Sequence, residues 1–253
     1  MSNETLKNFY SEKYSSNAAV EDIDLIETVK YPCNRFEAVV KFLPNHFKGG
    51  NILEIGAGNG NVAKTLLASN LPINSYTLGE LSLPRVEGVR KNLADERVKV
   101  VEMDVEDMNE SEYGTYDAIL MVALIEHLID PMGAMQRIHK MIKPGGFVYI
   151  DTPNIAKYTR RLLLLHGRFP STSSTHEGLT TYGGKPAALH DEGHLHYFTY
   201  RSLSRMLTER CGFSKVIKVG YPIGKIPIGK HMHNYLAQTW PEMFSELAIF
   251  AYA

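Results

Sequence analysis

The stretch NILEIGAGNGN, residues 51–61, decides the fold. An apolar run leads into glycines at Gly56, Gly58 and Gly60, and a helical pattern follows them. Glycines at these positions permit a tight turn and let a ligand approach the backbone at the N-terminal end of a helix. The dinucleotide fingerprint G-x-G-x-x-G would require a glycine at the position that Asn61 occupies. The turn therefore predicts a ligand site that differs from the pyrophosphate site of nicotinamide enzymes.

Between residue 50 and about residue 151, short apolar runs alternate with helical stretches, which is typical of a parallel sheet with crossover helices. The predicted strands are 51–55, 73–78, 98–101, 117–122 and 147–150, followed later by 216–219 and 247–252. The predicted helices are 61–69, 84–93, 131–142 and 200–210. We predict an α/β fold, a Rossmann-like parallel sheet with helices on both faces, an antiparallel last strand and a substrate-covering insert.

The alternating pattern is absent before residue 50 and breaks after residue 151. The predicted units are an N-terminal helical cap at 1–49, with helices at 17–29 and 36–42, and a core at 50–253 with irregular inserts at about 154–193 and 221–235. The first insert is long and rich in Ser, Thr and Gly. Loops of this length in compact domains are usually functional or disordered, so we expect this one to cover the acceptor.

Composition excludes several classes of protein. A formal net charge of -1 leaves no basic excess for a large nucleic-acid partner, so we expect a small-molecule or glycan acceptor. Cys33 and Cys211 are too few for a disulfide framework. The longest apolar run, 118–125, is far shorter than a membrane span, and the N-terminus shows no signal-peptide pattern. We expect a cytoplasmic protein with no membrane contact; the sequence does not indicate its oligomeric state.

Acidic residues follow the second and third predicted strands. Glu80, about twenty residues after the glycine turn, can accept hydrogen bonds from both hydroxyls of a ribose. The Asp104 carboxylate can accept a hydrogen bond from the exocyclic amine of an adenine, while the backbone amide of its neighbour Val105 can donate one to a ring nitrogen. Asp107 competes with Asp104 for this role. These positions predict a nucleoside-binding pocket.

Residues 50–152 resemble the ubiquinone-biosynthesis-like branch of the class I S-adenosylmethionine-dependent methyltransferases. The resemblance is carried by the spacing Glu54-x-Gly56-x-Gly58-x-Gly60 and by the stretches YDAILM at 116–121, LIEHLIDP at 124–131 and KPGG at 143–146. The later stretches TPN at 152–154 and HLHYFT at 194–199 resemble a group often met in bacterial glycan and natural-product methylation. The cofactor implied is S-adenosyl-L-methionine, bound by Glu54, Gly56, Gly58, Gly60, Glu80, Asp104 and the backbone near Met121.

The expected reaction is O-methylation of a small molecule or sugar by in-line methyl transfer. His127 or His194 would act as the general base, because a neutral imidazole suits proton abstraction from a hydroxyl near pH 7. Two rival functions remain open. An NAD(P)-dependent oxidoreductase is disfavoured by Asn61 and by the absence of an evident Tyr-Lys pair, and a non-catalytic S-adenosylmethionine-binding protein would keep the same turn.

Some O-methyltransferases that resemble this chain hold a divalent metal with a Glu-x-x-Glu-His motif. Here the corresponding stretch is ALIEH at 123–127, in which the first carboxylate is missing. We therefore expect no metal, although Glu126, His127, His194 and His196 could still converge.

Overall fold

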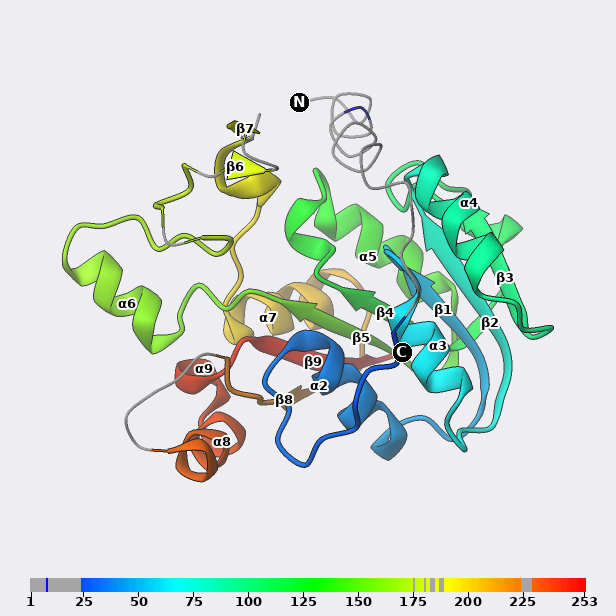
Figure 1. Ribbon diagram of the computed structural model, residues 1–253, viewed down its shortest axis with the longest axis horizontal. Helices are drawn as coiled ribbons and strands as arrows, with labels where there is room; N and C mark the ends of the chain where they lie inside the picture. Colours follow the sequence, from blue (N-terminus) through cyan, green and yellow to red (C-terminus); the bar gives the residue numbers. More distant parts are fainter. Residues whose placement is uncertain are drawn as a thin grey trace.

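The computed structural model describes residues 8, 24–174, 176–179, 181–182, 185–186, 189–223 and 229–253. A seven-stranded sheet in the order β3-β2-β1-β4-β5-β9-β8 forms its centre (Figure 1). The strands are β1 (Gly50–Ile55), β2 (Ile73–Glu80), β3 (Val98–Glu102), β4 (Tyr116–Val122), β5 (Ile142–Thr152), β8 (Lys215–Val219) and β9 (Leu247–Tyr252). Strands β1 to β5 are parallel, whereas β9 is antiparallel to both β5 and β8. The predicted fold class, with its antiparallel last strand, is confirmed.

Helices cover both faces of this sheet (Figure 1). They are α2 (Arg35–Phe42), α3 (Asn61–Leu67), α4 (Leu83–Asn92), α5 (Pro131–Lys140), α6 (Tyr158–Leu165), α7 (Tyr200–Arg210), α8 (Lys230–Thr239) and α9 (Pro241–Phe244). A short hairpin of β6 (Thr181–Tyr182) and β7 (Lys185–Pro186) accompanies them. Figure 1 places α6 and this hairpin on the opposite side of the molecule from β3 and α4. Among the described residues, no helix is long and apolar enough to cross a membrane.

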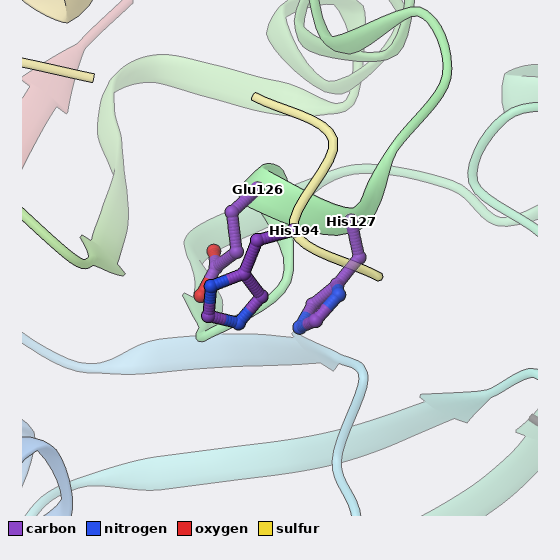
Figure 2. A group of neighbouring side chains, drawn as sticks. All are labelled: Glu126, His127 and His194. Carbon is purple, nitrogen blue, oxygen red and sulfur yellow. The ribbon is translucent and has the colours of Figure 1, made fainter. Parts of the chain in front are cut away.

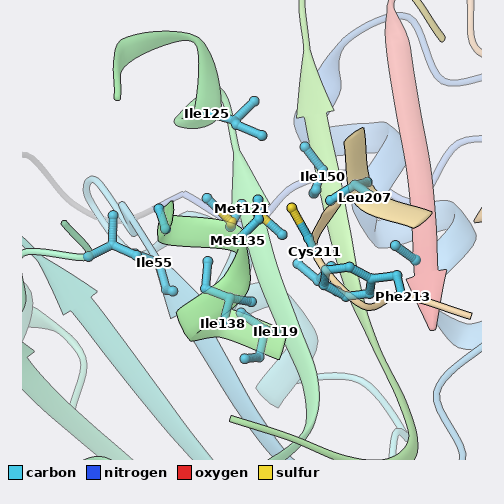
Figure 3. Close-up of a cluster of buried hydrophobic side chains, with 14 of the residues drawn as sticks. Ile55, Ile119, Met121, Ile125, Met135, Ile138, Ile150, Leu207, Cys211 and Phe213 are labelled. Atoms are coloured by element: carbon cyan, nitrogen blue, oxygen red, sulfur yellow. The ribbon is translucent and has the colours of Figure 1, made fainter. Parts of the chain in front are cut away.

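Two hydrophobic clusters, one on each face, hold the helices to the sheet. Figure 3 shows the first cluster, in which Met135 and Ile138 of α5 and Leu207 of α7 pack against the inward side chains of the central strands. The second joins α2, α3 and α4 to the other face through residues such as Val39 and Leu66. Because the central strands are buried on both faces, they read in the sequence as continuous apolar runs.

Several elements differ from their predicted bounds. Of the predicted helix 17–29, residues 24–29 are irregular and the rest lies outside the described residues. Strand β5 begins at Ile142 instead of at residue 147. The KPGG stretch that was expected to precede the strand lies inside it, where the pairing with β4 shifts its register. The insert predicted as irregular at 221–235 contains the start of α8, whose polar surface concealed its helical pattern. The division into a cap and a core remains a proposal.

A buried ionic cluster ties the first insert to the sheet. The Glu246 carboxylate lies just before β9 and accepts hydrogen bonds from Lys157 Nζ at 3.0 Å and Arg160 Nη1 at 2.7 Å. The carboxylate also accepts a hydrogen bond from the Asn154 backbone amide at 2.8 Å. Burial would raise the pKa of Glu246, but the cations of Arg160 and Lys157 outweigh burial and lower it. The two cations thus share one carboxylate that is only 5% exposed.

We expect Glu246→Gln to reduce the free energy of unfolding by about 3–5 kcal/mol, because it leaves the buried Lys157 and the partly buried Arg160 without their counter-charge. Thermal and urea unfolding would measure the loss. The matched control is Glu209→Gln, which removes an equivalent contact to Arg205 on the exposed surface of α7 and should change little. Equal effects of the two substitutions would contradict a structural role for the buried cluster.

Candidate active site

The glycine turn after β1 adopts a conformation that favours glycine. Gly56, Gly58 and Gly60 have φ values of 73°, 58° and 82°, in the left-handed region that L side chains rarely adopt. The Gly56 amide donates to the carbonyl of Gly79 on β2 at 2.8 Å, so the turn stays attached to the neighbouring strand. The chain then enters α3 at Asn61.

The Glu80 carboxylate at the end of β2 holds this turn in place. Its Oε2 accepts a hydrogen bond from the backbone amide of Gly58 at 2.9 Å. Its Oε1 accepts hydrogen bonds from the amides of Leu81 at 3.0 Å and Ser82 at 3.3 Å. Arg85 Nη1 lies 4.0 Å from Oε2. Glu80 is 7% exposed and belongs to the lining of the pocket described next. It therefore lies at the position where the sequence analysis expected a ribose ligand.

A pocket opens where β1 to β4 end, at the edge of a parallel sheet where ligands usually bind. Each strand end contributes to its wall. The lining residues are Ile55, Gly56, Glu80, Leu81, Arg85, Met103, Asp104, Val105, Glu106, Ala123, Leu124, His127 and Leu128. The wall is mainly apolar, with carboxylates at two strand ends. This arrangement suits a flat apolar base joined to a polar sugar.

The predicted cofactor residues divide into two groups. Gly56, Glu80, Asp104, Val105 and the predicted base His127 line the pocket together.

The remaining predicted residues do not belong to the pocket lining. Glu54 is buried and accepts a hydrogen bond from the Tyr76 hydroxyl at 2.7 Å, and burial raises its pKa to about 7. Met121 lies fully buried in the hydrophobic cluster. Gly58 and Gly60 shape the turn behind the wall. On the side of β4, Ala123 and Leu124 form the pocket wall instead of Met121.

Several pocket residues were missed because their side chains carry no distinctive chemistry. Met103, Leu124 and Leu128 supply apolar surface, and they follow strand ends as the predicted residues do. Their positions next to Asp104 and His127 were the available signal. Glu106 was also missed; its carboxylate accepts the amides of Ile129 at 3.1 Å and Asp130 at 2.6 Å.

His127 and His194 lie beside each other although they are far apart in the chain. Their ring centroids are 4.6 Å apart and the rings meet edge to face. Figure 2 shows the two imidazoles side by side, with the Glu126 carboxylate next to the His194 ring. His127 Nδ1 lies 3.1 Å from the carbonyl oxygen of Gly193. A carbonyl only accepts hydrogen bonds, so in the neutral ring Nδ1 carries the proton and Nε2 keeps the lone pair.

Burial, followed by the neighbouring His127, lowers the pKa of His194 to about 4. Its imidazole is therefore neutral at pH 7 and binds a proton weakly. His196, the third histidine considered in the sequence, does not join the pair, because its Nε2 contacts the carbonyl oxygen of Ile129 at 3.2 Å.

Glu126 completes a group that could hold a metal ion (Figure 2). One ligand atom from each of Glu126, His127 and His194 lies within 4.8 Å of the others. Glu126 Oε2 accepts the Thr152 hydroxyl at 2.9 Å, whereas Oε1 is buried without a hydrogen-bond partner among the described residues. A carboxylate with two imidazoles is a donor set that zinc or iron accepts. Ala123 stands where the resembling metal enzymes carry their first carboxylate.

Comparison with known proteins gives a family match over most of the chain. The family model described as "Methyltransferase domain" matches residues 27–218. Among curated relatives, ubiquinone biosynthesis O-methyltransferase from Acinetobacter baumannii is 25% identical over 108 residues, covering 42% of this chain and 45% of the relative. The Pectobacterium carotovorum enzyme of the same name is 28% identical, covering 42% and 44%. The chain thus matches less than half the length of these relatives.

Solved structures share the fold at low sequence identity. The DhpI-SAM-HEP complex aligns with a TM-score of 0.62 at 13% identity and covers all of both chains, at 100% each. A possible histamine N-methyltransferase from Thermotoga maritima aligns at 0.57 and 15% identity, covering 98% of this chain and 99% of that one. The plantazolicin methyltransferase BpumL in complex with SAH aligns at 0.56 and 15%, covering 99% and 91%.

We expect Glu80→Ala to weaken binding of S-adenosylhomocysteine by roughly 1.5–3 kcal/mol, because charged hydrogen bonds to the ligand and to the turn are lost together. Isothermal titration would measure the affinity, with Glu87→Ala on the exposed side of α4 as the matched control. Wild-type affinity in a folded Glu80→Ala variant would remove this residue from the binding site.

Proposed function

The chain belongs to the methyltransferase-domain family, and on this basis we propose that it transfers the methyl group of S-adenosyl-L-methionine to a hydroxyl of a small acceptor. The observation that carries the proposal is the convergence of the turn, Glu80, Asp104 and His127 in one pocket at the carboxyl edge of the sheet. The reading as a nicotinamide oxidoreductase loses its support, because the matching family is one of methyltransferases.

The pocket fits the nucleoside part of this cofactor. Glu80 lines the pocket at the end of β2, where its carboxylate can accept hydrogen bonds from the ribose hydroxyls. Asp104 and the amide of Val105 follow β3, where they can bind the edge of the adenine. Additional side-chain atoms at Gly56 would meet Leu124 at 3.3 Å, so glycine keeps this part of the wall open. The bound cofactor supplies a methyl group already activated by its sulfonium.

With an activated methyl group, the chain has mainly to align the acceptor, exclude water and remove a proton. Alignment in line with the breaking bond contributes roughly 7–11 kcal/mol in favourable cases. His127 lines the pocket and keeps the lone pair of Nε2, so it takes the hydroxyl proton as the acceptor oxygen gains the methyl group. His194, with its pKa of about 4, is too weak a base for this step.

The finer identity of the acceptor also belongs to this proposal. A small molecule or a sugar is consistent with the near-neutral formal charge of -1. O-methylation is consistent with His127 in the pocket lining, where the imidazole can receive the proton that a hydroxyl acceptor loses. We propose a cytoplasmic location, consistent with Cys33 and Cys211 both being free thiols.

We expect His127→Ala to lower the rate of methyl transfer by about a hundredfold or more while S-adenosylhomocysteine affinity stays nearly unchanged, because the lost interaction belongs to the transition state. Transfer of tritiated methyl from S-adenosylmethionine into a deproteinised small-molecule extract would measure the rate. His166→Ala, at the exposed end of α6, is the matched control. Near-normal transfer by folded His127→Ala would exclude the histidine base.

We propose that the reaction needs no divalent metal, since the first carboxylate of the resembling metal motif is replaced by Ala123. The group of Glu126, His127 and His194 is the specific reason to test this point. Protein stripped with a chelator and verified as metal-free by mass spectrometry should retain its full rate. Loss of activity that zinc, manganese or iron restores would favour metal-assisted transfer at these residues.

A further inference from the structure

The buried carboxylate of Asp191 lies outside the pocket and has no role in the mechanism above. Asp191 is 0% exposed, and the turn that carries it has φ values of 52° at Asp191 and 57° at Glu192. Left-handed conformations of residues other than glycine cost of the order of 1–3 kcal/mol each and persist only where surrounding contacts enforce them. The turn directs Asp191 inward and brings the Gly193 carbonyl to His127.

Hydrogen-bond donors from the first insert surround the Asp191 carboxylate. Its Oδ1 accepts the hydroxyls of Ser171 and Ser173, the latter at 2.7 Å. Its Oδ2 accepts the Thr172 hydroxyl at 2.7 Å, the Thr172 amide at 3.1 Å and the Tyr197 hydroxyl at 3.2 Å. Because donors from Ser171, Thr172 and Ser173 point at both of its oxygens, the carboxylate acts as an acceptor in each of these hydrogen bonds. These hydrogen bonds outweigh burial and lower the pKa of Asp191.

The Thr172 hydroxyl links this carboxylate to His194. Thr172 Oγ1 lies 2.7 Å from Asp191 Oδ2 and 2.6 Å from His194 Nδ1. A hydroxyl has one proton, and the ionised carboxylate has none to give, so Thr172 donates to Asp191. The contact between Oγ1 and Nδ1 then requires a proton on Nδ1. We propose that Asp191, acting through Thr172, fixes His194 in the tautomer with a protonated Nδ1 and an unprotonated Nε2.

The same tautomer follows for His127 from its contact with the Gly193 carbonyl. The short segment 191–193 therefore sets the proton position on both imidazoles, on His194 through Asp191 and on His127 through Gly193. In the neutral state both rings have an unprotonated Nε2, which can accept a hydrogen bond or proton. Asp191 and Thr172 are positioning residues; the significance of the tautomer for catalysis rests on the proposed function.

The test is nitrogen-15 NMR of histidine-labelled full-length protein at pH 7, where the tautomer of a neutral ring determines which nitrogen is bonded to hydrogen. The signals of His194 are assigned by their loss in His194→Gln. In the wild type we expect Nδ1 of His194 to carry the proton of the neutral ring. Asp191 Oδ2 lies 3.7 Å from His194 Nδ1, beyond hydrogen-bond distance, whereas Thr172 Oγ1 lies at 2.6 Å. Thr172→Val keeps the side-chain size and removes the acceptor at 2.6 Å, so His194 should lose its protected Nδ1–H signal. Thr172→Ser keeps the hydroxyl and should retain it.

The signals of His127 serve as the internal control for folding, because its partner is the Gly193 carbonyl. A wild-type His194 protonated on Nε2 would overturn the proposal, as would an unchanged Nδ1–H signal in Thr172→Val. Should Thr172→Val unfold, the wild-type tautomer and Thr172→Ser still decide the question. Because no methyl transfer enters the measurement, its failure is distinguishable from failure of the proposed function, which cofactor titration tests separately.

Discussion

The hydrogen bonds between the Glu80 carboxylate and backbone amides are the interaction on which the pocket depends. One oxygen accepts the amide of Gly58 in the turn after β1, and the other accepts the amides that follow β2. The carboxylate thereby joins two neighbouring strand ends at the place where the sheet opens. Because its own side chain also reaches the pocket, the group that builds the turn is available to a ligand lying against it.

The two sides of the site are built by different means. The proposed cofactor side consists of strand ends and the short segments that follow them, so the sheet itself determines its geometry. The proposed acceptor side consists of the η3 turn (Ile125–His127) and the returning segment around His194, which meet because the chain leaves the sheet and comes back. The amides of Leu195 and His196 donate to the carbonyl of Glu126 and hold the two segments together.

Buried carboxylates fix the path of the insert at both of its ends. Near the start of the insert, the Glu246 carboxylate binds the cations of Lys157 and Arg160. Near the end of the insert, the Asp191 carboxylate accepts hydrogen bonds from hydroxyl groups such as that of Thr172. In each case a buried carboxylate needs hydrogen-bond donors close to its oxygens. This requirement restricts the backbone paths that the insert can follow. The described parts of the insert are thus specified by polar contacts more than by apolar packing.

The sequence by itself determined the order of the strands and helices along the core, the turn at Gly56 to Gly60 and the carboxylates Glu80 and Asp104. These features depend on local periodicity, turn chemistry and position relative to strand ends, which act within a few residues. The tertiary structure decided the rest. Glu54 is buried and accepts a hydrogen bond from Tyr76, and His194 lies beside His127 with its Nδ1 against the Thr172 hydroxyl. Hydrogen bonds between residues twenty or more positions apart depend on how the chain returns, and no local pattern encodes that path.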